Sequence, residues 1–111
     1  MQTIEWQDFE KVELRVGTIR SARANEKAVK PAYVLEVDLG ELGIKTSSAQ
    51  VTAHYSLSEL IGRQVLCVCN FAPKRIAGAR SEVLVTGAYD SDNRVVLAGF
   101  DKPLPNGARL A

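Results

Sequence analysis

The sequence is short of aromatic residues, cysteine, histidine and net charge, and each shortage excludes a class of protein. Seven of the 111 residues are aromatic, and because several of these must pack inside, the sequence argues against a base-stacking platform for single-stranded nucleic acid. Cys67, Cys69 and the single His54 lack the spacing of a metal-ligand set. The formal net charge of +1 excludes the strong global field of a basic nucleic-acid coat protein, although local basic patches are compatible with it.

Long apolar runs are also missing. The longest, residues 65–69, is far shorter than the roughly 20 residues that a membrane-spanning helix needs. Residues 1–6 have neither a basic start nor the apolar stretch of a secretion signal. We therefore expect a cytoplasmic protein with no membrane insertion.

The composition that is present is that of an ordinary globular protein, with 46% hydrophobic and 24% charged residues. A length of 111 residues corresponds to one domain by the usual range of roughly 100–200 residues. We expect a single domain over residues 1–111, with a barrel over about residues 8–90 and an extension over residues 94–111.

Short runs of alternating apolar and polar residues, bounded by Gly, Pro, Asp or Asn, predict strands. In the first run, Gly17 falls where a barrel strand bulges or bends. One clear helix is expected over residues 55–62, with Ser56 as N-cap and Glu59 completing a capping box. The expected strands cover residues 12–19, 33–39, 44–51, 65–71, 81–87 and 94–98.

Five strands with a short helix between the third and the fourth match the order of an OB-fold, a five-stranded Greek-key barrel of the all-β class. Residues 65–69 and 83–85 are apolar on both faces, more than a single barrel interior needs. This surplus predicts a covered outer surface, and a homodimer with the C-terminal extension at its seam would cover it. The alternative is that the helix and the tail of the same chain cover this surface.

Patterns that indicate catalysis or a cofactor are missing. There is no Gly-rich phosphate loop, and no pair of carboxylates falls in a recognisable cleft. His54 has no Ser or Cys nucleophile in a known arrangement, which favours a surface or capping role. Cys67 and Cys69 would point the same way along one strand, a poor geometry for a disulfide, and we expect them to pack as small apolar residues. We expect no enzyme activity, no metal and no cofactor.

The segment after the fourth expected strand carries most of the candidate binding residues. Asn70 offers amide donors and an acceptor to a ligand backbone or base edge, or it ties down the following turn. Lys74 and Arg75 suit a phosphate or the acidic groups of a partner, or they are solvated charges. Phe71 and Ile76 place apolar surface beside them, an amphipathic rim that suits an extended polypeptide, although either residue could equally belong to the core.

Two serines interrupt the third expected strand. Small hydroxyls at Ser47 and Ser48 leave room for a ligand to approach the barrel face closely. The alternative interpretation is that both are ordinary strand positions.

Several of these stretches occur together in one known family. Residues 15–19 (RVGTI), 37–40 (VDLG), 70–78 (NFAPKRIAG) and 81–84 (SEVL) resemble the EMAP-like tRNA-binding OB domain that is attached to some aminoacyl-tRNA synthetases. Within that family the chain is most similar to the stand-alone CsaA-type secretion chaperones, from about residue 8 to the end. The resemblance implies a homodimeric OB-fold that is not an enzyme.

The resemblance implies two kinds of ligand. CsaA-type members are export chaperones that bind unfolded precursor proteins and the SecA motor, whereas other stand-alone relatives bind structured tRNA. In the tRNA binders a Lys commonly precedes the second strand and the fifth strand opens with Ser-x-x-Met. Here Pro31 stands at the first place with Lys30 adjacent, Ser81 is retained, and Leu84 replaces the Met, which fits the chaperone branch.

The sequence therefore predicts a protein-export chaperone, with a structure-selective tRNA-binding protein as the alternative. The predicted binding residues are Lys30, Ser47, Ser48, Asn70, Phe71, Lys74, Arg75, Ile76, Ser81 and Leu84.

Overall fold

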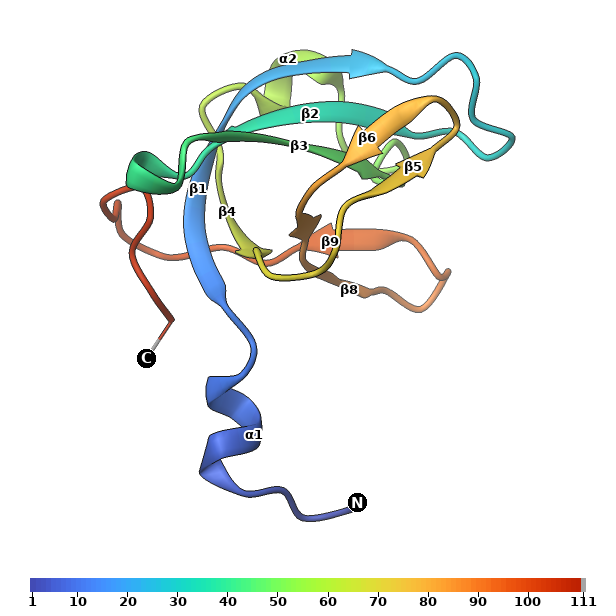
Figure 1. Cartoon of the computed structure of the whole chain (residues 1–111). Coiled ribbons are helices and arrows are strands. Elements are labelled where there is room, and N and C mark those ends of the chain that lie inside the picture. The colour runs from blue at the N-terminus through green and yellow to red at the C-terminus, as the bar shows by residue number, and fades with distance from the viewer. Residues whose placement is uncertain (111) are drawn as a thin grey trace.

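A computed structural model describes residues 1–110, and in it five antiparallel strands curl into a nearly closed barrel (Figure 1). The strands lie in the order β3-β2-β1-β4-β7, so β3 and β7 are the two edges that meet. This arrangement confirms the predicted all-β, five-stranded OB-type barrel. The strands are β1 (Leu14–Ala24), β2 (Tyr33–Asp38), β3 (Ile44–Ala49), β4 (Gln64–Val68) and β7 (Leu84–Val85).

Short helices and two hairpins complete the chain. The hairpin β5 (Lys74–Ile76) with β6 (Ala79–Ser81) lies near the β1–β2 loop at one end of the barrel, and β8 (Gly87–Tyr89) pairs with β9 (Val95–Leu97) (Figure 1). The helical elements are α1 (Trp6–Glu10), η1 (Gly40–Leu42) and α2 (Leu57–Leu60). Helix α2 falls between β3 and β4, as the sequence predicted.

The longest strand, β1, has two partners. Its first half pairs with β4, from Leu14 opposite Val68 onward, and its second half pairs with β2. We expected a bulge or a sharp bend at Gly17; the register shift of β1 lies instead between Ile19 and Ser21. Gly17 serves a close approach instead: a Cβ at this position would collide with Val37 and lie 2.8 Å from Leu39 Cδ2.

The barrel interior is filled by branched apolar side chains, as the alternating pattern requires. Helix α2 closes one end, because its Leu60 is fully buried in the core. The Ser56 hydroxyl caps this helix and Glu59 reaches back to the Ser56 N–H, which confirms the predicted capping box. The largest fully buried side chains are those of Val16, Ile19, Leu35, Val37, Leu39, Leu60, Val65 and Cys67.

The expected strand over residues 81–87 is wrong in its extent, because the chain changes partners twice within it. Ser81 ends the β5–β6 hairpin. The N–H groups of Glu82 and Val83 then turn to the Thr46 carbonyl, at 2.8 and 3.3 Å. Lys74 and Arg75, two of the predicted binding residues, form β5 of that hairpin together with Ile76.

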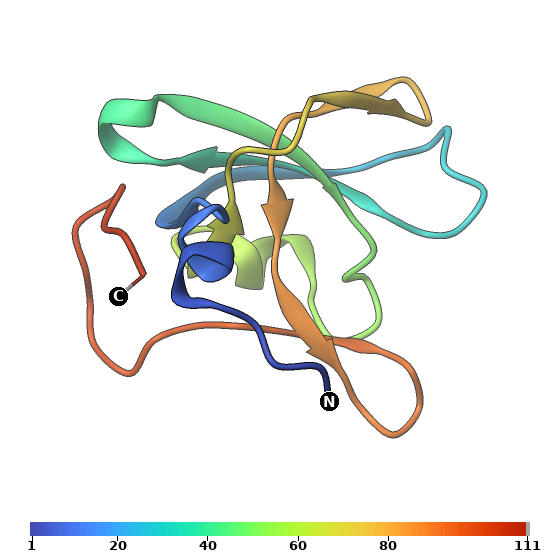
Figure 2. The same cartoon turned by 60° about the horizontal axis from the view of Figure 1, so that its bottom comes forward.

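The C-terminal tail returns to the barrel of its own chain. Gly107 N donates to Val16 O at 2.7 Å, Val16 N to Ala108 O at 2.8 Å, and Leu110 N to Leu14 O at 3.0 Å. The tail therefore covers the edge of β1 that β4 leaves open. Figure 2 shows its course around the barrel. The homodimer stays a prediction.

Both cysteines are free thiols, and burial raises the pKa of Cys67 to about 12. Across residues 1–110, no three His, Cys, Asp or Glu side chains gather in a way that could hold a metal ion. None of the helices in this part of the chain has the length and apolar character needed to cross a membrane.

Candidate functional site

A groove lies where the two barrel edges meet, between β3, the β5–β6 hairpin and β7. We call it the seam groove; its volume is about 370 Å³. It brings together six of the predicted binding residues, from three separate stretches of the chain. Its walls are formed by Ser48, Phe71, Ala72, Lys74, Ile76, Ser81, Glu82, Val83 and Leu84.

The seam groove is apolar and cationic together. Phe71 is 60% exposed and Leu84 is 49% exposed, although both are large apolar side chains. Ile76 is half-buried beside them, and the exposed Lys74 stands in the same wall. A contiguous apolar surface with a charged rim is typical of a site that binds a partner.

Side chains hold the seam together where backbone ladders hold the rest of the barrel. Glu82 Oε1 accepts hydrogen bonds from Thr46 N at 3.1 Å and from Thr46 Oγ1 at 3.0 Å. Ser81 Oγ accepts a hydrogen bond from Ser48 N at 3.2 Å. The backbone hydrogen bond from Thr46 is the main reason that the pKa of Glu82 lies below its ordinary value. The seam is thus closed by these side-chain hydrogen bonds together with the two backbone bonds to the Thr46 carbonyl.

Four predicted residues lie outside the seam groove: Ser47, Asn70, Arg75 and Lys30. Ser47 is 1% exposed and does not line the seam groove. Asn70 uses its amide inside the molecule, because Oδ1 accepts from Glu13 N at 2.9 Å and Nδ2 donates to Lys11 O at 2.7 Å. The structure therefore supports the interpretation of Asn70 as a residue that ties down neighbouring chain. Arg75 is exposed on the hairpin and donates to Gly78 O at 3.1 Å.

Lys30 lines the cavity that continues the seam groove along β3. This second cavity has a volume of about 700 Å³ and shares Ser48 and Leu84 with the first. Gln50 forms part of its wall on the β3 side, and Val85 forms part of the wall on the β7 side. The two cavities together follow the line along which the barrel fails to close.

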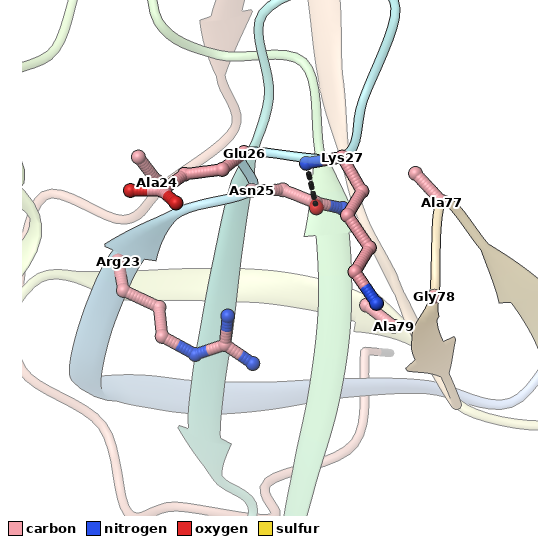
Figure 3. A pocket seen from close by; sticks show the side chains of 8 residues that line it. All are labelled: Arg23, Ala24, Asn25, Glu26, Lys27, Ala77, Gly78 and Ala79. Atoms are coloured by element: carbon pink, nitrogen blue, oxygen red, sulfur yellow. Dashed lines mark hydrogen bonds between the residues drawn. The ribbon is translucent and has the colours of Figure 1, made fainter.

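Positive charge gathers at the end of the barrel beside the seam groove. Here the β1–β2 loop meets the β5–β6 hairpin: Asn25 Nδ2 lies 3.5 Å from Ile76 O, and the Lys27 side chain lies over Gly78. A third cavity of about 480 Å³ opens between them (Figure 3). We call this region the basic end; its cations are Arg23, Lys27, Lys30, Lys74, Arg75 and Arg80.

The cations of the basic end are not neutralised internally. Within residues 1–110, none of the six forms a salt bridge. Figure 3 shows the Glu26 carboxylate extending away from the Lys27 ammonium group. Arg75 and Arg80 stand directly opposite each other across the hairpin, an arrangement of like charges that destabilises a sheet unless an anion lies nearby.

The sequence alone missed Thr46 and Glu82, which set the shape of the seam. The sequence held one weak signal for Glu82: an acidic residue within the apolar pattern of residues 81–87 indicates that the strand is interrupted there. The sequence also missed Gln50, because an exposed polar residue just beyond a strand has no distinctive pattern.

Comparison with known structures identifies two close likenesses over the whole chain. The crystal structure of the chaperone CsaA from Bacillus anthracis is 44% identical, with a TM-score of 0.93 over 99% of this chain and 100% of that chain. The CsaA chaperone protein from Picrophilus torridus is 42% identical, with a TM-score of 0.91 over 98% of this chain and 100% of that chain.

Comparison with curated proteins identifies a much longer relative. The chain is 32% identical to a methionine–tRNA ligase from Flavobacterium johnsoniae over 107 residues, which is 96% of this chain. It spans about 15% of the length of that ligase. The family model described as "Putative tRNA binding domain" matches residues 14–109, from the start of β1 to the tail that pairs with it. This chain belongs to the tRNA-binding domain family.

Proposed function

We propose that this protein is a chaperone that binds unfolded precursor polypeptides in the seam groove. The observation that carries the proposal is the pair of exposed apolar residues, Phe71 and Leu84, facing a groove that also holds Lys74. The likeness to CsaA chaperones over the full length of both chains supports it.

The seam groove suits a chain that has no fixed structure. Unfolded polypeptides expose apolar side chains, and burying one large apolar side chain stabilises a complex by about 1.5–3 kcal/mol. Since Phe71 and Leu84 are about half exposed, each can contribute about half of that range. Such contacts are non-directional, so one groove can accept many sequences.

The narrower predictions belong to this proposal. We infer that the protein acts in protein export in the cytoplasm, that it works with the SecA motor, and that it forms a homodimer. Two equivalent grooves in a dimer would raise the avidity for one long client. The proposed function needs neither catalysis nor a cofactor.

Binding of reduced, carboxymethylated α-lactalbumin, a permanently unfolded protein, tests the proposal. Fluorescence anisotropy of the labelled probe should show saturable binding that Phe71→Ala weakens about five- to tenfold, a loss that corresponds to about 1 kcal/mol. Phe100→Ala is the matched control, because Phe100 is also partly exposed but lines none of the cavities described above. The control should bind within twofold of the unaltered protein. Equal binding by both variants would contradict the proposal.

A second candidate function is the binding of structured tRNA through the basic end. The specific observation in its favour is the set of six cations without carboxylate partners, including the opposed Arg75 and Arg80. The family model and the methionine–tRNA ligase relative add support.

Salt dependence separates this candidate from the first. Contacts to phosphates release counterions, so affinity for bulk tRNA should fall steeply with salt, with a log–log slope of roughly −0.9 for each phosphate neutralised. The triple variant Arg23→Gln, Lys27→Gln, Arg80→Gln should flatten this slope, whereas Lys102→Gln in the tail should not. A slope that is flat in the unaltered protein, or unchanged in the triple variant, would exclude the basic end as an RNA site.

A further inference from the structure

The outward edge of β3 offers backbone groups to a partner. In an antiparallel sheet, successive residues of an edge strand point their N–H and C=O groups alternately toward the neighbouring strand and away from it. Thr46 and Ser48 point theirs away from β2, since Thr46 N bonds Glu82 and Ser48 N bonds Ser81 Oγ. The next outward position is Gln50, which is exposed just beyond the end of β3.

Two of these outward groups have no partner. Within residues 1–110, neither the Ser48 carbonyl nor the Gln50 N–H forms a hydrogen bond with the protein. Thr46 differs, because its carbonyl accepts from Glu82 N and Val83 N. Backbone-to-backbone hydrogen bonding between the two barrel edges therefore stops at Thr46. Beyond it the Ser48 N–H still bonds the Ser81 hydroxyl, whereas the Ser48 carbonyl and the Gln50 N–H are left without a partner.

The free stretch lies along the open seam and not on a convex surface. Ser48 lines both the seam groove and the cavity that continues it, and Gln50 lines the second. Leu84 lines both cavities from the opposite side. An exposed edge strand is a template for pairing with another chain.

We propose that an extended segment of an unfolded polypeptide binds as an added strand along β3, pairing its backbone with the Ser48 carbonyl and the Gln50 N–H. This inference rests on the proposed chaperone function and specifies how the client is held. Backbone hydrogen bonds supply affinity that does not depend on the client sequence, while alternate side chains of the client pack against Leu84 and Phe71. Ser81 Oγ already accepts a hydrogen bond from the Ser48 N–H on this side of β3. The client backbone would continue the same line of hydrogen bonds along β3.

Selective N-methylation of a peptide tests this geometry on the unaltered protein. The probe is a capped nine-residue peptide in which Ser alternates with Val or Leu, so that all Ser N–H groups face one side of the strand and all Val and Leu N–H groups face the other. One version is N-methylated at the Ser positions and the other at the Val and Leu positions. At least one version should bind at least tenfold more weakly than the parent peptide, since N-methylation removes the donors that face the sheet.

A pair of protein variants identifies β3 as the pairing edge. Gln50→Pro removes the N–H and should weaken binding of the parent peptide at least fivefold, whereas Gln50→Ala keeps the N–H and should bind within twofold. Because Gln50→Pro could disturb the end of β3, amide hydrogen exchange on the unaltered protein gives a second measurement. The Gln50 amide should become at least tenfold more protected when the parent peptide is bound.

The outcomes separate this inference from the function on which it rests. Equal binding by the parent and both N-methylated peptides, or an unprotected Gln50 amide at saturation, would overturn strand addition and leave the groove as a side-chain site. Protection of Gln50 that rises with protein concentration alone would also overturn it, since a second copy would then occupy the seam. No binding of either the parent peptide or carboxymethylated α-lactalbumin would overturn the chaperone function as well.

Discussion

The two sides of the barrel are held together in different ways. Around β1, backbone ladders dominate: β4 pairs with its first half, β2 pairs with its second half, and the tail bonds the other edge at Leu14 and Val16. At the seam, β3 is held mainly by the side chains of Ser81 and Glu82, with backbone bonds confined to Thr46. The side around β1 is therefore fixed by backbone ladders, whereas the proposed binding side depends on a few contacts made by Thr46, Ser81 and Glu82.

The largest expected effect comes from making the same substitution on both sides. Leu35 is fully buried, and Leu35→Ala should lower the free energy of unfolding by about 3 kcal/mol through the cavity it creates. Leu84→Ala should change the free energy of unfolding by less than about 1 kcal/mol, because the side chain is already half exposed. Urea denaturation measures both values.

The same two variants should rank in the reverse order when binding is measured in place of stability. Leu84→Ala should weaken binding of carboxymethylated α-lactalbumin severalfold, whereas the folded fraction of Leu35→Ala should bind normally. If Leu84→Ala cost as much stability as Leu35→Ala, the seam would be part of the structural core and the comparison would fail.

The next effect concerns the carboxylate that closes the seam. Glu82→Ala should lower the free energy of unfolding by about 1–2 kcal/mol, because it removes the partner of the Thr46 N–H, while the Thr46 hydroxyl keeps Arg80 O at 2.7 Å. Glu36→Ala is the control; the exposed Glu36 bonds only the Ser21 hydroxyl on the laddered side and should cost less than about 0.5 kcal/mol. Thermal and urea unfolding would measure the two variants, and equal costs would contradict the difference between the two sides.

Acidification should open the same contact without a mutation. The pKa of Glu82 in the folded protein lies below its ordinary value of 4.5, mainly because Thr46 N donates to the carboxylate. Its contribution to stability is therefore complete above pH 4.5 and is lost as the pH falls through the lowered pKa. The stability difference between the unaltered protein and Glu82→Gln should shrink across this range in urea titrations. A difference that grows on acidification would reverse the assigned sign.

The smallest effect should come from Ser81→Ala. The Ser48 N–H loses its partner, but Ser48 is partly exposed and water can replace the hydroxyl, so the cost should be about 0.5 kcal/mol. Hydrogen exchange at the Ser48 amide should accelerate by more than a loss of about 0.5 kcal/mol in the free energy of unfolding would cause. Unchanged exchange would show that Ser81 does not hold the seam.

The barrel could be predicted from the sequence because the patterns that form its strands and its helix are local. Alternating apolar residues over β1 to β4 and the capping box at Ser56 are read directly from the chain, and the structure confirmed them. The site was predicted in part for the same reason: Phe71, Lys74, Ile76 and Ser81 lie close together in sequence, and the hairpin keeps them together in space.

What could not be predicted depends on contacts across the fold. Asn70 looks like a ligand-binding amide until its bonds to Lys11 and Glu13 are known. The division of the expected fifth strand depends on Thr46, which lies 36 residues earlier than Glu82. Such long-range hydrogen bonds have no local pattern, so only the structure reveals them.

The tail along β1 has a consequence for how the molecule behaves at high concentration. By bonding Val16 and Leu14 on their open side, residues 107–110 make that edge of β1 unavailable to other polypeptides. A protein with unpaired strand edges on both sides of one sheet could pair edge to edge with other copies and form fibres. In this protein the tail prevents such pairing at β1. Loss of the tail should therefore expose this edge of β1 to pairing with other polypeptides and promote aggregation.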